Sequence, residues 1–247
     1  MRIVSLAPSN TEILWAIGAG DDIVGNTMFC DYPAAAKEKN RNGSWLNPNI
    51  DSILSLEPDL VISSMYVPDD VQSDLAQNKI KHLHLNPLTL NGVMDSFVQI
   101  GNATGHLQEA LQLVEMFKES LEEATTVRRE SATRRRVYVE EWSNPPTVSG
   151  NWVPELVNLA GGVSMSSAGV PSLPITLDEL KTFDPDLIVV SICGAKNVTP
   201  EIVLKRKEWQ EIRAVVNSNV RVIEESLLNR PGPRLSLGLK QLTQWLA

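Results

Sequence analysis

A short motif that occurs twice in this chain constrains its fold more than any other feature. Residues 56–62 read LEPDLVI, and residues 183–189 read FDPDLIV. A weaker match relates residues 11–18 (TEILWAIG) to residues 154–161 (PELVNLAG). In the closer pair, a polar Pro-Asp turn leads into an apolar run that is typical of a buried strand. The repeat predicts two similar halves, and chance similarity between α/β elements would still leave two α/β lobes.

Short apolar runs alternate with helical segments in both halves of the chain. Ser9 and Glu12 follow the first run with the S-x-x-E spacing of a capping box, and the predicted helix ends near Gly18 and Gly20. The alternation predicts the α/β class, with two Rossmann-like lobes built on mainly parallel sheets. The expected strands are residues 3–6, 23–25, 60–63, 82–85, 137–139, 187–190 and 220–223.

A stretch without proline, residues 95–136, differs from the rest of the chain. Apolar residues recur at helical spacing from Leu107 to Leu121, which predicts one long helix from about His106 to Ser131. The last third of this helix is nearly all polar, as expected for a bridge between domains. We therefore expect an N-terminal lobe over 1–105, a bridging helix over 106–134 and a C-terminal lobe over 135–247.

The composition excludes several classes of protein. The 247 residues include 22 Lys and Arg and 30 Asp and Glu, a net charge of −8, and 43% are hydrophobic. Fibrous and disordered classes are excluded, and no window approaches the ~18 apolar residues of a membrane span. Arginines 134–136 form the one basic run, so we expect no nucleic-acid partner. The first residues lack the apolar core of a secretory signal, so either the protein is cytoplasmic or its leader has been removed.

Residues that could support catalysis or metal binding are few. No Ser/His/Asp set or G-x-S-x-G motif is present, so we expect no catalytic residues. His82 and His84 would share one face of a strand, but a third ligand is not evident, so we expect no metal. Cys30 and Cys193 each follow a predicted strand. They are either unpaired core residues or a pair that acts as thiols, as soft metal ligands or as a bridge.

Aromatic side chains gather on the predicted strand-to-helix loops, where ligands of α/β sheets bind. Aromatic walls suit a large, flat, partly apolar ligand, although single loop aromatics can also simply cover lobe edges. Arg230 and Arg234 lie in a proline-stiffened segment, which is either a structural turn or a source of hydrogen-bond donors to amides or acids of a ligand. The aromatic residues on these loops are Phe29, Tyr32, Trp45, Tyr66, Trp142 and Trp152.

Four segments, residues 2–12, 30–33, 57–62 and 144–150, resemble the cobalamin-binding proteins of ABC importers. These belong to the helical-backbone periplasmic binding protein superfamily, which also includes siderophore and haem binders. The resemblance covers nearly the whole chain. It implies two α/β lobes joined by one long helix, with a ligand cleft between the lobes.

The resemblance also implies roles for individual residues. Phe29 takes the position of a family tyrosine and Trp45 that of a family tryptophan, so both are expected to contact the ligand. Leu173 stands where the cobalamin binder has a tryptophan. Asp51 and Glu179 match the acidic residues that dock onto the membrane permease. Ordinary charge at a helix start is the alternative explanation for both.

We therefore expect a monomeric substrate-binding protein, not an enzyme, that captures cobalamin or a related corrinoid for an ABC importer permease. By resemblance it would act in the periplasm or at the cell surface, with no catalytic cofactor. A ferric siderophore or haem binder is one alternative. A cytoplasmic corrinoid- or metal-handling enzyme that uses Cys30 and Cys193 is another, and a purely structural role accounts least well for the loop aromatics.

Overall fold

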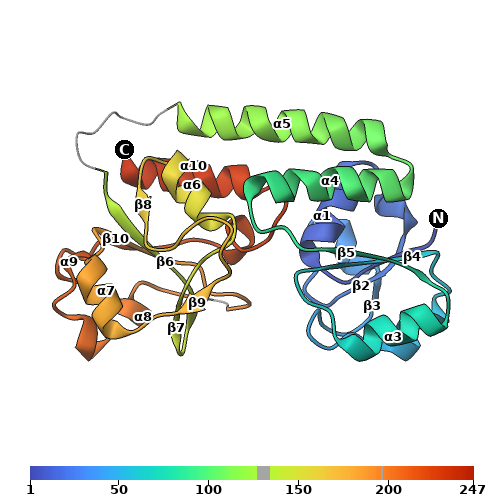
Figure 1. Cartoon of the computed structure of the whole chain (residues 1–247), viewed down its shortest axis with the longest axis horizontal. Coiled ribbons are helices and arrows are strands. Elements are labelled where there is room, and N and C mark those ends of the chain that lie inside the picture. The colour runs from blue at the N-terminus through green and yellow to red at the C-terminus, as the bar shows by residue number, and fades with distance from the viewer. Residues whose placement is uncertain (127–133, 196) are drawn as a thin grey trace. The chain divides into compact units, whose positions relative to one another are not determined.

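The computed structural model describes residues 1–126, 134–195 and 197–247, and the chain divides into two compact units (Figure 1). Unit 1 comprises Met1–Pro87 and Asn91–Phe117, and unit 2 comprises Leu88–Leu90 and Lys118–Ala247. Both units are α/β, as predicted. Among the described residues, no helix is both long and apolar enough to cross a membrane.

Unit 1 contains a five-stranded sheet in the order β3-β2-β1-β4-β5, and every strand pair in it is parallel. The chain winds outward from β1 in both directions, which is the doubly wound arrangement. All five carboxyl ends therefore lie at the same edge of the sheet. The strands are β1 (Ile3–Ser5), β2 (Ile23–Asn26), β3 (Asn40–Arg41), β4 (Leu60–Ser64) and β5 (Lys81–Leu85).

The core of unit 1 lies between this sheet and its helices. Val4 from the central strand β1 and Val61 from the adjacent β4 are fully buried, together with Ile53 and Leu75 from two helices. Burial of aliphatic side chains of this size supplies most of the stabilisation of such a layer. The helices are α1 (Pro8–Ala16), η1 (Gly20–Asp22), η2 (Ala34–Glu38), α2 (Ile50–Ser55), α3 (Asp69–Gln77), α4 (Leu90–Thr104) and α5 (Leu107–Thr125).

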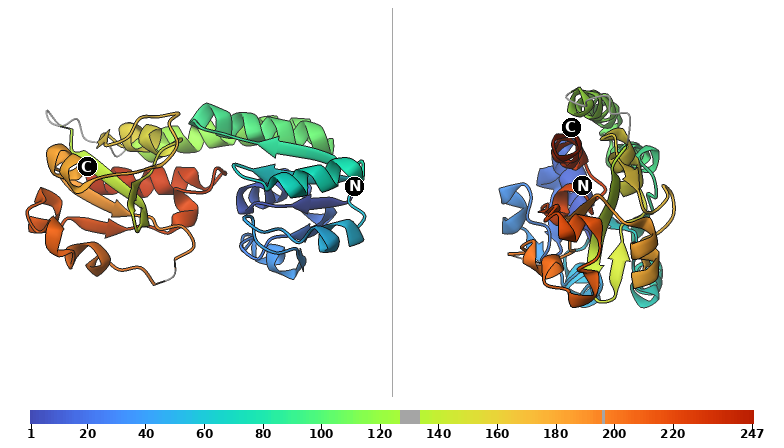
Figure 2. Two further views of the ribbon diagram at one scale, coloured as in Figure 1. Left: turned by 60° about the horizontal axis from the view of Figure 1, so that its bottom comes forward. Right: turned by 90° about the vertical axis from the view of Figure 1, so that its left-hand side faces the viewer.

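Helices α4 and α5 form a closely packed pair joined by a short turn. Phe97 and Phe117 meet edge to face with ring centroids 5.5 Å apart. A Cβ added at Gly101 would lie 2.3 Å from the Cβ of Ala110, so only glycine permits this approach of the two helices. Figure 1 shows α5, in green, as one continuous helix, which the right-hand view of Figure 2 shows nearly end-on, and the boundary between the two units falls within it.

Unit 2 contains a mixed sheet in the order β11-β10-β6-β7-β9, with β8 also paired to β6. The β6, β8, β10 and β11 pairs are parallel, whereas β7 pairs antiparallel with both β6 and β9. The strands are β6 (Arg136–Ser143), β7 (Pro146–Val148), β8 (Val163–Ser164), β9 (Leu173–Pro174), β10 (Leu187–Val190) and β11 (Val220–Val222). The helices are α6 (Val153–Leu159), α7 (Leu177–Phe183), α8 (Glu201–Leu204), η3 (Lys207–Trp209), α9 (Arg213–Val216), η4 (Glu225–Leu227) and α10 (Leu235–Leu246).

A buried ion pair lies in the core of unit 2. The Glu140 side chain is fully buried, and its carboxylate accepts from both terminal nitrogens of the Arg206 guanidinium, with Nη1 to Oε2 at 2.6 Å and Nη2 to Oε1 at 2.7 Å. Tyr138 and Ser143 donate further hydrogen bonds to the same carboxylate. Burial, together with the negative charge of Glu140, raises the pKa of the Tyr138 hydroxyl. The Arg206 guanidinium also stacks 4.2 Å from the centroid of Trp209.

The repeat in the sequence corresponds to a repeat in the backbone. Glu57 and Asp184, at matching positions, both adopt left-handed φ angles, of 46° and 44°. In unit 1 the backbone N–H of Arg2 donates to Asp59 Oδ2 at 2.7 Å, and in unit 2 that of Arg136 donates to Asp186 Oδ2 at 2.8 Å. The motif therefore forms the same turn before β4 and before β10, which confirms the two α/β halves.

Two local predictions were wrong or incomplete. Helix α1 begins at Pro8 with Ala7 as its N-cap and no side-chain cap, so the predicted capping box at Ser9 and Glu12 is absent. Both residues are buried within the helix instead.

Helix α5 ends at Thr125, and most of its predicted continuation to Ser131 falls on residues 127–133, outside the described residues. The domain boundaries at 105 and 135 stay a prediction.

Candidate ligand-binding site

Four exposed aromatic side chains lie on the loops that follow the strands of unit 1. Phe29 and Trp45 are 39% and 37% exposed, and Tyr32 and Tyr66 are each 49% exposed. Trp45 and Tyr66 meet edge to face with ring centroids 6.4 Å apart and an interplanar angle of 84°. We call Phe29, Tyr32, Trp45 and Tyr66 the aromatic surface. Adjacent exposed apolar rings often mark an interaction site, and ligands of parallel sheets bind beyond the carboxyl ends of the strands.

Arg41 holds together the loops that carry the aromatic surface. Its Nη1 donates to Asn26 Oδ1 at 2.9 Å, to Thr27 O at 2.6 Å and to Cys30 O at 3.0 Å. The backbone N–H of Met28 also donates to Gly43 O at 3.0 Å. These bonds connect residues 27–30 with residues 41–43, so the backbone beneath Phe29 is fixed before any ligand arrives.

Cys30 does not belong to the aromatic surface. Its side chain is 1% exposed, and its Sγ lies 3.2 Å from Thr11 Oγ1 and 3.3 Å from Thr27 Oγ1. Burial raises the pKa of the Cys30 thiol above its usual value. The thiol is therefore protonated and enclosed, and we leave it out of the ligand contacts.

In unit 2, the two predicted tryptophans occupy different environments. Trp142 lies on strand β6, not on a strand-to-helix loop as predicted, is 50% exposed, and donates its Nε1–H to Asn144 O at 3.0 Å. Trp152 is buried at the start of α6 and donates its Nε1–H to Leu228 O at 2.7 Å. Trp142 is thus available to a ligand, whereas Trp152 anchors the segment after β11. Leu173 on β9 is 52% exposed.

Both predicted arginines of unit 2 lie beside carboxylates. Arg230 Nη2 contacts Glu225 Oε1 at 2.8 Å, and Arg234 Nη1 lies 4.0 Å from Glu224 Oε1. Both arginine side chains are mostly buried. Carboxylates therefore already offset their charges, which weakens the expectation that they bind acidic groups of a ligand.

Cys193 lies among polar groups beyond the end of β10. Its Sγ accepts from Asn229 Nδ2 at 3.2 Å and donates to Glu141 Oε1 at 3.9 Å. Burial and the negative charges of Glu141 and Glu225 raise the pKa of the Cys193 thiol to about 12. Sequence reasoning missed Glu141 and Asn229, although two consecutive carboxylates, at 140 and 141, between an apolar strand and Trp142 were a visible signal.

The two predicted metal candidates face a hydroxyl. Ser63 Oγ lies 2.8 Å from His82 Nε2 and 2.8 Å from His84 Nδ1. Burial and the neighbouring His84 lower the pKa of His82. Within residues 1–126, 134–195 and 197–247, no group of three or more His, Cys, Asp or Glu side chains is placed to hold a metal ion. His82 and His84 are therefore strand residues that form hydrogen bonds with Ser63.

The predicted docking residues are both exposed and lie in the first turns of helices. Asp51 lies in the first turn of α2, whose N-cap Asn49 accepts from the backbone N–H of Ser52. Glu179 completes a capping box in α7, because its Oε2 accepts from Thr176 N at 2.7 Å and Thr176 Oγ1 at 2.8 Å. The backbone hydrogen bond from Thr176 lowers the pKa of the Glu179 carboxyl.

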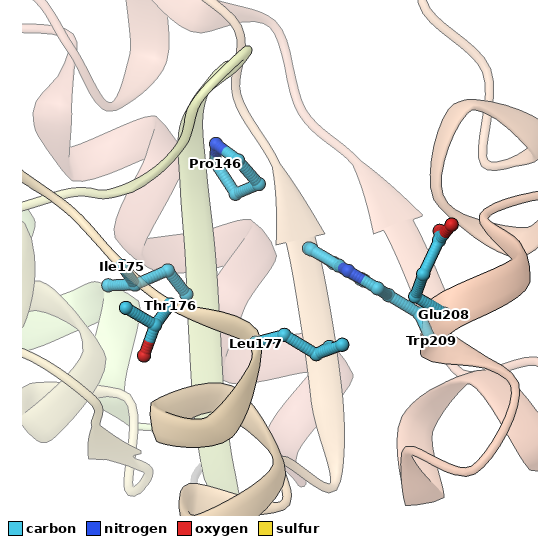
Figure 3. Close-up of a pocket in the computed structure, with 6 residues that line it drawn as sticks. All are labelled: Pro146, Ile175, Thr176, Leu177, Glu208 and Trp209. Carbon is cyan, nitrogen blue, oxygen red and sulfur yellow. The ribbon is translucent and has the colours of Figure 1, made fainter.

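A pocket of about 210 Å³ lies next to this capping box in unit 2 (Figure 3). Leu177 and Trp209 point toward one another across it, and Glu208 points away. It contains none of the predicted ligand-binding residues. The residues that line it are Pro146, Ile175, Thr176, Leu177, Glu208 and Trp209.

Comparison with known proteins identifies the family. A family model described as "Periplasmic binding protein" matches residues 3–227, so this chain belongs to the periplasmic binding protein family. An uncharacterized ABC transporter substrate-binding lipoprotein, YvrC of Bacillus subtilis (strain 168), is 32% identical over 98% of this chain and 79% of its own length. The vitamin B12-binding protein of Yersinia pestis (strain Pestoides F) is 28% identical over 100% of this chain and 86% of its own length.

Solved structures show the same architecture. The periplasmic vitamin B12-binding protein BtuF of Vibrio cholerae has a TM-score of 0.81 and 27% identity, covering 99% of this chain and 96% of its own. The periplasmic haem-binding protein RhuT of Roseiflexus sp. RS-1, in its apo form, has a TM-score of 0.87 and 22% identity, with 99% and 97% coverage. Because RhuT is only 22% identical to this chain, its similarity shows the fold alone.

These matches define the class of the protein. It is a substrate-binding protein of an ABC transporter, of the vitamin B12, haem and siderophore class. Such proteins are transport components and not enzymes, and their partners are a small-molecule ligand and a membrane permease. The relatives are periplasmic or lipoprotein binding proteins.

Proposed function

We propose that this chain captures a corrinoid and delivers it to the permease of an ABC importer. The observation that carries the proposal is the aromatic surface of unit 1, at the carboxyl edge of a parallel sheet. Exposed rings give a large, flat macrocycle much contact area at a low entropy cost. The relationship to proteins named for vitamin B12 binding supports the same ligand class.

Phe29, Trp45 and Tyr66 contact the macrocycle in this proposal. Tyr32 and Trp142, which are 49% and 50% exposed, are further candidates for aromatic contacts with a ligand. Hydrogen bonds within their own units hold Cys30 and Trp152 in buried positions, so neither contacts the ligand. The loop that Arg41 holds through its hydrogen bonds to Thr27 O and Cys30 O needs little rearrangement when a ligand binds, which lowers the entropy cost of binding.

Asp51 and Glu179 are the proposed docking residues for the permease. Both carboxylates are exposed on the first turn of a helix. Exposed carboxylates of this kind can pair with arginines of a membrane partner, and such pairs steer association. We propose that the protein is a monomer. We also propose that it acts outside the cytoplasmic membrane, where a ligand-loaded binding protein meets its permease.

The alternative enzyme that uses the two cysteines receives no support from their environments. Cys30 is enclosed by Thr11 and Thr27, and the pKa of Cys193 is raised to about 12. A reactive or metal-binding cysteine needs a thiolate, which a raised pKa disfavours. We therefore propose capture and delivery without chemistry.

A ligand panel tests the proposal. The purified protein is mixed separately with cyanocobalamin, haemin and a ferric siderophore, desalted, and examined by absorbance spectroscopy. We expect cyanocobalamin to be retained at one ligand per chain and the other two to be removed. Retention of haemin or the siderophore without cyanocobalamin would replace the corrinoid with that ligand.

A further inference from the structure

A group of hydrogen-bonding side chains meets at the carboxyl ends of the parallel strands of unit 2. Glu141 follows the buried part of β6, Cys193 follows β10, and Asn229 follows β11. These positions correspond to the edge at which ligands of parallel sheets bind. The group, which we call the polar cluster, consists of Glu141, Ser172, Cys193, Glu225 and Asn229.

A bulge in β6 sets the position of Glu141. Glu140 is paired with Val148 of β7 and Trp142 with the preceding Thr147, so Glu141 is the extra residue on β6. A bulge of this kind redirects the extra side chain relative to the regular alternation of the strand. Glu140 can therefore enter the core while Glu141 joins the polar cluster, immediately before the exposed Trp142.

Fixed bonds orient the Glu141 carboxyl. Ser172 Oγ donates to Glu141 Oε2 at 2.5 Å, and the backbone N–H of Gly150 donates to Ser172 Oγ at 3.0 Å. Asn151, the next residue in that loop, has a buried side-chain oxygen without a hydrogen-bond partner among the described residues. An acceptor without a donor is costly when buried, so this loop is suited to a ligand that brings N–H groups.

The charge balance of the polar cluster is unfavourable for anions. The guanidinium of Arg230 lies 2.8 Å from Glu225 Oε1, so a carboxylate already offsets its positive charge. Burial raises the pKa of the Glu141 carboxyl. The hydrogen bond from Ser172 lowers this pKa, and the negative charge of Glu225 raises it further. A second carboxylate placed here would meet the same repulsion and the same desolvation.

We infer that the polar cluster is the subsite that receives the uncharged amide arms of the ligand, and that Glu141 makes it reject ligands whose arms are carboxylates. This inference rests on the proposed corrinoid function, because a corrinoid carries primary amides around its macrocycle. A primary amide offers both N–H donors and a carbonyl acceptor, which matches a cluster of carboxyl, thiol, amide and hydroxyl groups. Each member of the cluster is partly exposed.

The test compares cyanocobalamin with derivatives in which one peripheral amide is hydrolysed to a carboxylate. Dissociation constants are measured by titration calorimetry for the wild-type protein, Glu141→Gln and the matched control Glu201→Gln. Glu201 is an exposed carboxylate in the first turn of α8. We expect the wild type to bind at least one carboxylate isomer about tenfold more weakly than cyanocobalamin. Glu141→Gln should reduce the difference to about twofold, and the control should keep it.

The possible failures are distinguishable. If the wild type binds cyanocobalamin and every carboxylate isomer with equal affinity, the inference is wrong and the proposed function stands. The same holds if Glu141→Gln binds cyanocobalamin and retains the full discrimination. If the wild type does not bind cyanocobalamin at all, the proposed function and the inference fail together. Thermal melting of each variant identifies one that has not folded, and Glu141→Asp, which keeps the charge, should then preserve the discrimination.

Discussion

Trp45 and Tyr66 meet edge to face on the surface of unit 1, with ring centroids 6.4 Å apart. This geometry leaves part of each ring exposed while each ring restricts the other's rotation. Two rings fixed in this way present a preorganised apolar contact, which lowers the entropy cost of binding a rigid ligand. The aromatic surface is therefore the part of the molecule on which the account of its function depends.

Trp45→Ala should weaken cyanocobalamin binding by about 10- to 100-fold, because an aromatic anchor that becomes buried on binding contributes about 1.4 to 3 kcal/mol. Trp45→Phe should recover most of the loss. Trp245→Ala, in α10 and outside the aromatic surface, is the matched control and should bind as the wild type does. Calorimetry on the three variants makes the comparison, and equal affinities for Trp45→Ala and wild type would contradict the role of this ring.

Glu179→Gln should reduce the stimulation of importer ATPase activity in proteoliposomes several-fold, without changing ligand affinity. Because Glu179 also caps α7, Thr176→Ala serves as the control, since it weakens the cap while keeping the charge. Thr176→Ala should lower the free energy of unfolding by about 1 kcal/mol and leave the stimulation intact. Asp178→Asn, one residue away and also exposed, should do neither. Equal losses for Glu179→Gln and Asp178→Asn would mean that bulk charge, and not this position, drives docking.

Arg206→Met should strongly destabilise the protein, because it leaves the Glu140 carboxylate buried without its partner. Breaking one side of such a pair costs about 3 to 5 kcal/mol, measured as the free energy of unfolding in urea. The double variant Arg206→Met with Glu140→Gln should recover part of the loss. A single variant as stable as the wild type would show that the ion pair contributes nothing.

Both cysteines should react slowly with iodoacetamide in the folded protein. With a pKa of about 12, Cys193 is almost entirely protonated at pH 8, and its thiolate fraction rises about tenfold for each pH unit up to that value. Labelling of Cys193, followed by mass spectrometry, should therefore accelerate between pH 8 and pH 10, while Cys30 should stay protected by burial. In urea both should label at the rate of a free thiol. Rapid labelling of native Cys193 at pH 7 would revive the enzyme alternative.

The overall fold was predictable because its signals are local. The turns before β4 and before β10 depend on one short motif, and Glu57 and Asp184 adopt the same left-handed backbone in both units. Gly18 and Gly161, paired by the weaker match, likewise have left-handed φ angles of 85° and 94° after their helices. Hydrophobic runs and glycine positions carry this information without any long-range contact.

The site was predictable only in part, because burial and pairing depend on residues distant in the chain. Trp152 was expected to contact ligand, yet its indole bonds to the carbonyl of Leu228. Arg230 was expected to be a donor to ligand, yet Glu225 lies against it. The bulge that redirects Glu141 comes from the pairing of β6 with β7, which no local pattern encodes. Composition can indicate which residue types gather at a sheet edge, but not which of them remain accessible.

The most direct test of the central claim is titration calorimetry of the purified protein with cyanocobalamin, with Trp45→Ala measured in parallel. We predict saturable binding of one ligand per chain that weakens at least about tenfold in the variant. Absence of binding heat across a range of temperatures, with a folded protein and no retained cyanocobalamin, would contradict it.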